Sequence, residues 1–178
     1  DLLRSTTARH RSGLKLIAAP KEMLPIESMP GEQLLQIVEL AKKNFATLFV
    51  DLPTNWTNWS LSLAARSDLV LLFTELSVAG LNGARRQLDL FNSQDLGGLD
   101  IRVVVNRFVK NQLRNFREQD IERTLGRGVS FYVSNDFPLM RSAIDRGISL
   151  ADVKRKSALG SDIDAIAAAL AASLEAKS

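Results

Sequence analysis

The sequence contains no cysteine and only one histidine among its 178 residues. Without cysteine, the chain can form neither a disulfide framework nor a catalytic thiolate, which fits a reducing compartment. With no second histidine either, a zinc site of the usual ligands is not expected. The apolar runs are far shorter than the roughly 20 residues that a membrane-spanning helix needs. The first residues do not form a signal peptide pattern.

The chain also has little excess of either sign of charge, since the formal net charge is only +3. The basic residues are scattered, apart from small groups near the start of the chain and at residues 154–156. This distribution is typical of a solvated surface and not of a basic stripe, so no specific nucleic-acid partner is expected. The hydrophobic content of 46% is enough for one sizeable core. The composition therefore predicts a single domain over residues 1–178.

Apolar runs of strand length alternate with segments of helical periodicity. Strands are predicted at residues 14–19, 46–52, 68–75, 101–108 and 129–136. Helices are predicted at residues 34–45, 58–66, 78–91, around 121–125, at 137–146, and from a Ser161/Asp164 capping box onward. This repeated strand–helix order predicts an α/β fold with a mostly parallel sheet and helices on both faces.

Polar residues end four of the predicted strands. In chain order they are Asp51, then Thr74 and Glu75, then Asn106 and Arg107, and last Ser134, Asn135 and Asp136. Ligands of open parallel sheets bind beyond the carboxyl ends of the strands, so these residues are expected to share one edge.

Two of these strand-end residues each have two interpretations. The Asp51 carboxylate suits a magnesium ion beside a phosphate, but it equally suits the cap of the next turn. The Asn106 amide can bind the edge of a purine or simply form a turn.

The phosphate-binding motif expected beside such residues is missing. None of the ten glycines is followed by lysine, so the chain contains no G-x-x-x-x-G-K-[ST]. These 178 residues therefore cannot by themselves bind phosphates as a P-loop does, and alone they are expected to show no ATPase activity.

Four segments taken in order resemble a known family. They are DLP-x-NWT-x-W from residue 51, SDLVLLFTELSVAGLNGARRQLDLF from 67, VVVNRF from 103 and YVSNDFPLMRSAIDRGISL from 132. Their order and spacing resemble the CpaE/TadZ proteins of Flp-type pilus assembly, which are P-loop ATPases of the MinD/ParA group. The similarity extends from about Gly13 to Ser149. Since the chain starts at Asp1 and not at methionine, the resemblance implies that the P-loop segment precedes it and that the P-loop strand fills the middle of the sheet.

The resemblance implies roles for the strand-end residues. Asp51 matches the Walker B aspartate that supports magnesium, and the loop from Leu52 matches the second switch. Asn106 and Arg107 match a pair on the adenine side. Ser134, Asn135 and Asp136 match a segment that flanks the base, and Ser134 stands where the family usually has proline. That replacement removes a rigid turn from the nucleotide site.

The resemblance also implies cofactors and partners for the complete protein. ATP or ADP and magnesium are the expected cofactors, and ATP is expected to drive face-to-face homodimerisation. Trp56 and Asn82 are the candidate interface residues, although Trp56 and Trp59 are also compatible with covering the edge of a core. The expected partners are pilus or secretion components, and the expected location is the cytoplasm, at a cell pole or beside the inner membrane.

Two other functions remain compatible with the sequence. One is a non-hydrolysing scaffold with an ATPase-like fold, which the serine at position 134 favours. The other is a receiver domain, in which a strand-end aspartate such as Asp51 accepts phosphate. No acidic pair follows the first predicted strand, and the chain is long for a receiver.

Overall fold

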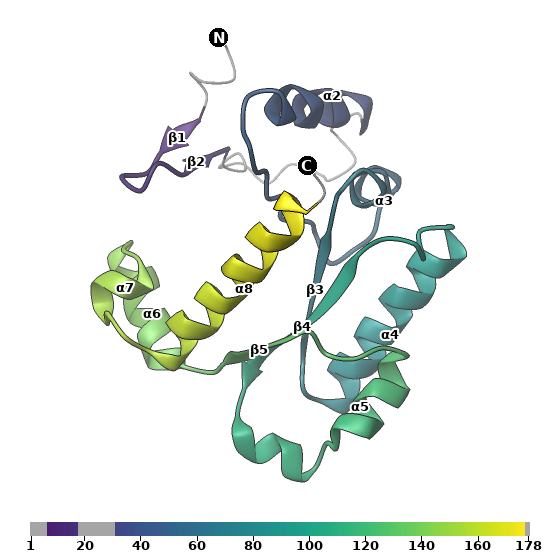
Figure 1. Cartoon of the computed structure of the whole chain (residues 1–178), viewed down its shortest axis with the longest axis vertical. Helices are drawn as coiled ribbons and strands as arrows, with labels where there is room; N and C mark the ends of the chain where they lie inside the picture. The colour runs from purple at the N-terminus through teal and green to yellow at the C-terminus, as the bar shows by residue number, and fades with distance from the viewer. Residues whose placement is uncertain (1–6, 18–30, 177–178) are drawn as a thin grey trace. The chain divides into compact units, whose positions relative to one another are not determined.

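The computed structural model describes residues 7–17 and 31–176, and the chain divides into two compact units, Asp1–Arg66 and Ser67–Ser178. Figure 1 shows both units, and each is described by itself. The single domain predicted over residues 1–178 stays a prediction.

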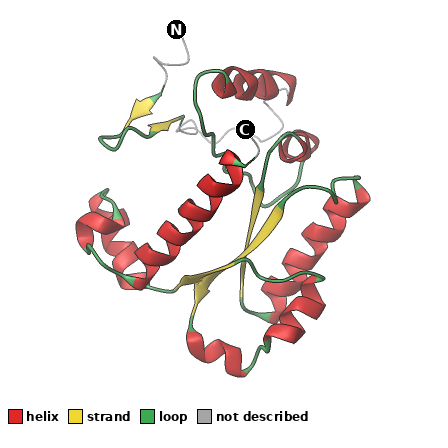
Figure 2. Cartoon of the chain, viewed as in Figure 1, coloured by secondary structure: helices red, strands yellow, loops and turns green. Residues whose placement is uncertain are grey.

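The second unit is built on a three-stranded parallel sheet. Its strands are β3 (Val70–Glu75), β4 (Ile101–Phe108) and β5 (Phe131–Ser134), in the order β3-β4-β5. Helices α4 (Val78–Ser93) and α5 (Glu118–Leu125) pack together on one face, and α8 (Ala158–Glu175) covers the other (Figures 1 and 2). The remaining elements are η2 (Lys110–Arg114), α6 (Phe137–Arg146) and α7 (Leu150–Val153). The predicted α/β architecture is therefore confirmed.

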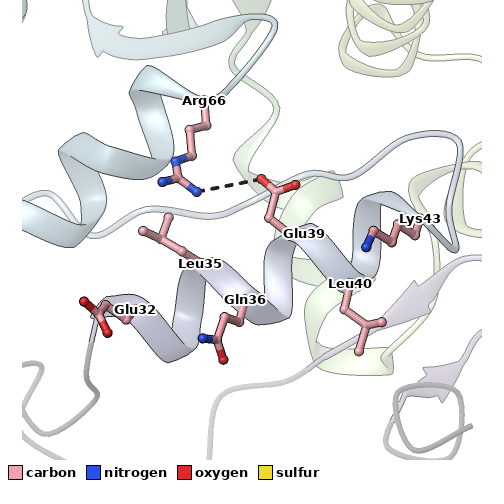
Figure 3. Close-up of a pocket in the computed structure, with 7 residues that line it drawn as sticks. All are labelled: Glu32, Leu35, Gln36, Glu39, Leu40, Lys43 and Arg66. Carbon is pink, nitrogen blue, oxygen red and sulfur yellow. Dashed lines mark ion pairs between the residues drawn. The ribbon is translucent and has the colours of Figure 1, made fainter.

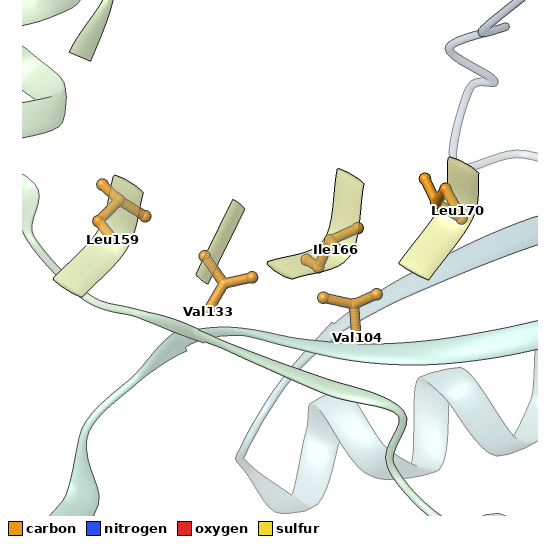
Figure 4. Packing of buried hydrophobic residues seen from close by; sticks show 5 residues of the cluster. All are labelled: Val104, Val133, Leu159, Ile166 and Leu170. Carbon is orange, nitrogen blue, oxygen red and sulfur yellow. The ribbon is translucent and has the colours of Figure 1, made fainter. Parts of the chain in front are cut away.

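The central strand β4 is apolar on both faces because helices cover both of them. Its residues Val103, Val104 and Val105 are all 0% exposed. Figure 4 shows the cluster on the α8 face, which joins Val104 and Val133 of the sheet to three aliphatic residues of the helix, Leu159, Ile166 and Leu170. A continuous apolar run such as the one in β4 is typical of a parallel strand buried on both faces.

Local caps determine where the helices of the second unit begin and end. Asp136 caps α6 by accepting a hydrogen bond from the Leu139 backbone N–H at 3.2 Å, and α6 stops at Gly147, which has a φ of 60°. Both ends of α6 match the prediction. Helix α8, in contrast, starts one turn before the predicted Ser161 because the Ser157 side chain accepts from the Gly160 N–H at 3.0 Å. The prediction that a Ser161/Asp164 capping box starts this helix is therefore wrong.

The first unit contains a short hairpin and two helices. Strands β1 (Ala8–Arg9) and β2 (Lys15–Leu16) pair antiparallel, and helices α2 (Gly31–Lys42) and α3 (Asn58–Ala65) contact each other. Trp59 lies close to Gly31, where an added Cβ would meet the Trp59 Cβ at 3.1 Å. Trp59 is half-buried, and its role as the cover of a core edge stays a prediction.

Two predicted buried strands of the first unit differ from the structure: one is absent, and the other, at residues 14–19, contains the short strand Lys15–Leu16 but is exposed. Residues 46–52 form no strand, and Phe49 in that segment is 71% exposed. In the predicted strand 14–19, Leu14 and Ile17 are also exposed, while residues 18–19 lie outside the described part of the chain. A strand needs neighbours for its backbone hydrogen bonds. Within residues 7–17 and 31–176, no strand pairs with residues 46–52.

Across the described part of the chain, no helix has both the length and the apolar character needed to cross a membrane.

Candidate functional site

The carboxyl ends of β3, β4 and β5 form one edge of the sheet, here called the carboxyl edge. Glu75 and Asn106 are partner positions in the last rung of the β3–β4 ladder. The next residue of β4, Arg107, extends its side chain toward β3, where its Nη1 donates to Glu75 Oε1 at 3.0 Å. The two side chains are 67% and 55% exposed, so this ion pair contributes little to stability and can exchange for a ligand.

A β-bulge reshapes the end of β4. The pairing with β5 shifts between Val105 and Phe108, and Arg107 adopts a left-handed conformation with φ of 53°. The Asn106 Oδ1 accepts a hydrogen bond from the Arg107 backbone N–H at 2.9 Å, which supports this conformation. Bulges often re-aim side chains beside functional sites.

The Asn106 amide retains capacity for a ligand. Its oxygen has a second lone pair, and within the described residues no hydrogen bond from its Nδ2 is found. An amide in that state can offer a donor and an acceptor to the edge of a purine.

The end of β5 is held on two sides. The Asn135 N–H donates to the Phe108 carbonyl at 2.9 Å, which ties it to β4. The Ser134 N–H donates to Asp162 Oδ2 of α8 at 2.8 Å. Because the Asp136 carboxylate caps α6, its role in the fold is local. The segment 134–136 is therefore a fixed part of the carboxyl edge.

Two aromatic rings lie behind the carboxyl edge. Phe108 and Tyr132 have ring centroids 4.7 Å apart with planes tilted by 51°. Burial raises the pKa of Tyr132 above its ordinary value, and the nearby charge of Glu118 raises this pKa further. The phenol therefore stays neutral at physiological pH and adds no charge to the carboxyl edge.

Two hollows on the described surface are lined by residues other than the strand ends of the carboxyl edge. Figure 3 shows one of about 510 Å³ in the first unit, lined by α2 residues and by Arg66, whose Nη1 lies 3.9 Å from Glu39 Oε1. None of the predicted site residues lines it. The other hollow, in the second unit, is lined by Asn82 among others and measures about 130 Å³. Ligand pockets usually measure about 300–1,000 Å³, so this hollow is smaller than a usual ligand pocket.

The structure brings five of the eight predicted site residues together. These are Asn106, Arg107, Ser134, Asn135 and Asp136, all at the carboxyl edge of the second unit. Exposed Asn82 belongs to the same unit but lies on α4. Asp51 and Trp56 belong to the first unit, where Asp51 is exposed in a loop and Trp56 is half-buried.

The described residues supply few metal ligands. No group of three or more His, Cys, Asp or Glu side chains that could hold a metal ion is found among residues 7–17 and 31–176. A single exposed carboxylate such as Asp51 nevertheless fits Mg²⁺, which keeps several waters and takes its other ligands from the phosphates of a nucleotide.

Three residues that shape the carboxyl edge were not among the predicted site residues, although Glu75 was expected at this edge as the end of a strand. Glu75 pairs with Arg107, and Asp162 holds Ser134. Gln112 accepts from the Val109 N–H at 2.8 Å and donates to the Leu76 carbonyl at 3.3 Å, which joins the segments after β3 and β4. The sequence signal for Asp162 was its spacing from Leu159 and Ile166 on one face of a helix, which the misplaced start of α8 obscured.

Comparisons with known proteins bear on the fold. No protein-family model and no curated protein sequence matches the chain. Solved structures do: a ParA family ATPase from Chlorobium tepidum TLS matches with a TM-score of 0.81 and 21% identity, over 91% of this chain and 67% of that one. The MinD cell division protein of Aquifex aeolicus matches with a TM-score of 0.71 and 20% identity, over 91% of this chain and 66% of that one. A MinC:MinD complex from the same organism matches with a TM-score of 0.71 and 19% identity, over 91% and 65%.

These likenesses establish the class of fold. The chain has the α/β fold of MinD/ParA-like P-loop NTPases and spans about two thirds of the length of these solved structures. The likeness concerns the fold alone.

Proposed function

We propose that this chain is the C-terminal part of a MinD/ParA-like ATP-binding protein that positions or assembles Flp/type IV-type pilus (Tad secretion) machinery through nucleotide-dependent dimerisation. The observation that carries the proposal is the carboxyl edge, where Asn106, Arg107 and residues 134–136 meet. Open parallel sheets bind their ligands at this place. The MinD/ParA-like fold and the resemblance of the four sequence segments to CpaE/TadZ proteins support the same class.

Each predicted residue has a role in this proposal. Asn106 and Arg107 contact the adenine side of ATP or ADP, and Ser134, Asn135 and Asp136 flank the base. Asp51 holds a water of the bound magnesium ion, which neutralises phosphate charge when present. Trp56 and Asn82 belong to the homodimer interface. The protein works in the cytoplasm, at a cell pole or beside the inner membrane, with pilus or secretion components as partners.

A catalytically silent scaffold for pilus assembly is the alternative. The observation that favours it is the serine at position 134, where the CpaE/TadZ family usually has proline. The parent chain separates the two functions, because an ATPase turns ATP over whereas a silent scaffold does not. These 178 residues alone are expected to be inactive in either case.

The proposal predicts that two substitutions weaken the ATP-dependent dimer of the full-length protein. Asp51→Asn removes the charge that supports magnesium, and Trp56→Ala removes an aromatic interface anchor, which can be worth about 2 kcal/mol or more. Sedimentation with ATP and magnesium should show a lower dimer fraction for both variants. Since Asp51 is exposed, its variant should melt at the parent temperature.

Asn55→Ala is the matched control, because Asn55 is an exposed residue of the same loop. It should leave the dimer fraction unchanged. If Trp56→Ala behaves like Asn55→Ala, Trp56 is not an interface residue. If Asp51→Asn melts far below the parent, Asp51 is structural and its proposed role is wrong.

A further inference from the structure

The amide of Ser134 lies on the outer side of an edge strand. Among the described strands, β5 is the last in the order β3-β4-β5, and its neighbour is β4. The bond to the Phe108 carbonyl comes from Asn135, so the Ser134 N–H points away from β4, and it donates to Asp162 Oδ2 at 2.8 Å. A serine at this position was expected to lose the rigidity of a proline. The carboxylate of Asp162 supplies a different constraint.

Asp162 belongs to helix α8, which packs firmly against the sheet. It lies on α8 between Leu159 and Ile166, which are 4% and 8% exposed and pack against the sheet. The spacing of three and four residues puts all three side chains on the same helix face, so the half-buried Asp162 is directed toward β5. Hydrogen bonds to a carboxylate are about twice as strong as neutral ones. Since α8 is fixed by its aliphatic contacts, this bond transmits its position to the end of β5.

We propose that Asp162 is a positioning residue for the base-binding part of the carboxyl edge, an inference that rests on the proposed function. It holds Ser134 from the outer side, while the Asn135 N–H is held by Phe108 from the β4 side. Together these two bonds fix the backbone from which Asn135 and Asp136 project. Without Asp162, the Ser134 N–H loses its acceptor and the segment 134–136 is held from one side only.

The test compares five variants of the full-length protein. Asp162→Ala removes the acceptor, and Asp162→Asn keeps an acceptor oxygen. Asp164→Ala is the matched control on the same helix, since Asp164 is exposed and no hydrogen bond from it to β5 is found in the described part of the chain. Ser134→Pro combined with Asp162→Ala removes the N–H and the acceptor together and restores stiffness. Proline is tolerated at such edge positions because their N–H groups do not belong to the ladder.

Two readouts are needed, amide hydrogen exchange at Asn135 and the Kd for ATP. Asp162→Ala is expected to speed exchange at Asn135 and to raise the Kd, each about tenfold, which corresponds to one charge-assisted hydrogen bond. Asp164→Ala should stay close to the parent in both, whereas Asp162→Asn should fall between the parent and Asp162→Ala, because its neutral oxygen accepts a weaker hydrogen bond than a carboxylate does. The double variant should recover most of the affinity, whereas Ser134→Pro alone should weaken binding because it leaves Asp162 without its donor.

The outcomes distinguish this inference from the proposed function. If the parent protein binds no ATP, the proposed function is wrong, and so is the role of Asp162 in positioning a base-binding segment. Amide hydrogen exchange at Asn135 still decides whether Asp162 holds the end of β5. If the parent binds ATP and Asp162→Ala matches Asp164→Ala in both readouts, Asp162 positions nothing. Failure of the double variant to recover affinity would also overturn the inference, because a purely structural loss in α8 is not repaired by a proline in β5.

Discussion

Truncation after Gly160 is expected to unfold the second unit at ordinary temperatures. It removes Ile166 and Leu170, which cover the fully buried Val104 (Figure 4). Each buried aliphatic side chain contributes about 1.5–3 kcal/mol, so the two together contribute about 3–6 kcal/mol, a large part of the roughly 5–15 kcal/mol of a typical domain. Thermal melting followed by circular dichroism measures this loss. Truncation after Glu175 is the matched control and should melt close to the parent.

The same truncation tests whether α8 binds a membrane. Amphipathic helices that bind at a membrane surface are usually rich in lysine and arginine, whereas residues 158–175 contain neither. Flotation with vesicles that contain anionic lipid should therefore give the same result before and after truncation. Loss of vesicle binding at an unchanged melting temperature would make α8 a membrane anchor and not a part of the core.

Phe91→Ala is expected to lower the free energy of unfolding by about 3–5 kcal/mol. Phe91 on α4 is 0% exposed, so its removal leaves a cavity that the surrounding helices cannot fill completely. Urea unfolding with an unchanged m-value measures the difference. Phe73→Ala is the matched control, since Phe73 on β3 is 53% exposed and should cost about 1 kcal/mol or less. Equal losses at both positions would contradict the burial seen on α4.

The elements of the second unit could be predicted because local signals agree there with packing. The limits of β4, residues 101–108, match the apolar run, and α6 starts at Asp136 and ends at Gly147 as the caps indicate. The segment 46–52 has the same apolar character as β4 but forms no strand among the described residues. An apolar run specifies that a segment can be buried, whereas the hydrogen-bonding neighbour that makes it a strand comes from elsewhere in the fold.

The candidate site could be predicted in part for a similar reason. The strand ends placed Asn106, Arg107 and residues 134–136 at one edge, because parallel strands end on the same side. The left-handed backbone of Arg107 and its ion pair with Glu75 depend on the register between two strands. The contact between Asp162 and Ser134 joins residues 28 positions apart. The helical spacing of Asp162 indicates the face on which it lies but does not specify Ser134 as its partner.

Mapping ATP onto the full-length protein tests the central claim, that the carboxyl edge binds an adenine nucleotide. Backbone amide chemical shifts are recorded with and without ATP and magnesium for the parent, for Asn106→Ala, and for Asn111→Ala as a control at an exposed position of η2. The account predicts that ATP shifts the amides of residues 106–107 and 134–136, and that Asn106→Ala weakens binding about tenfold while Asn111→Ala does not. The account would be contradicted if ATP left the amide shifts of these residues unchanged, or if the two variants bound ATP with equal affinity.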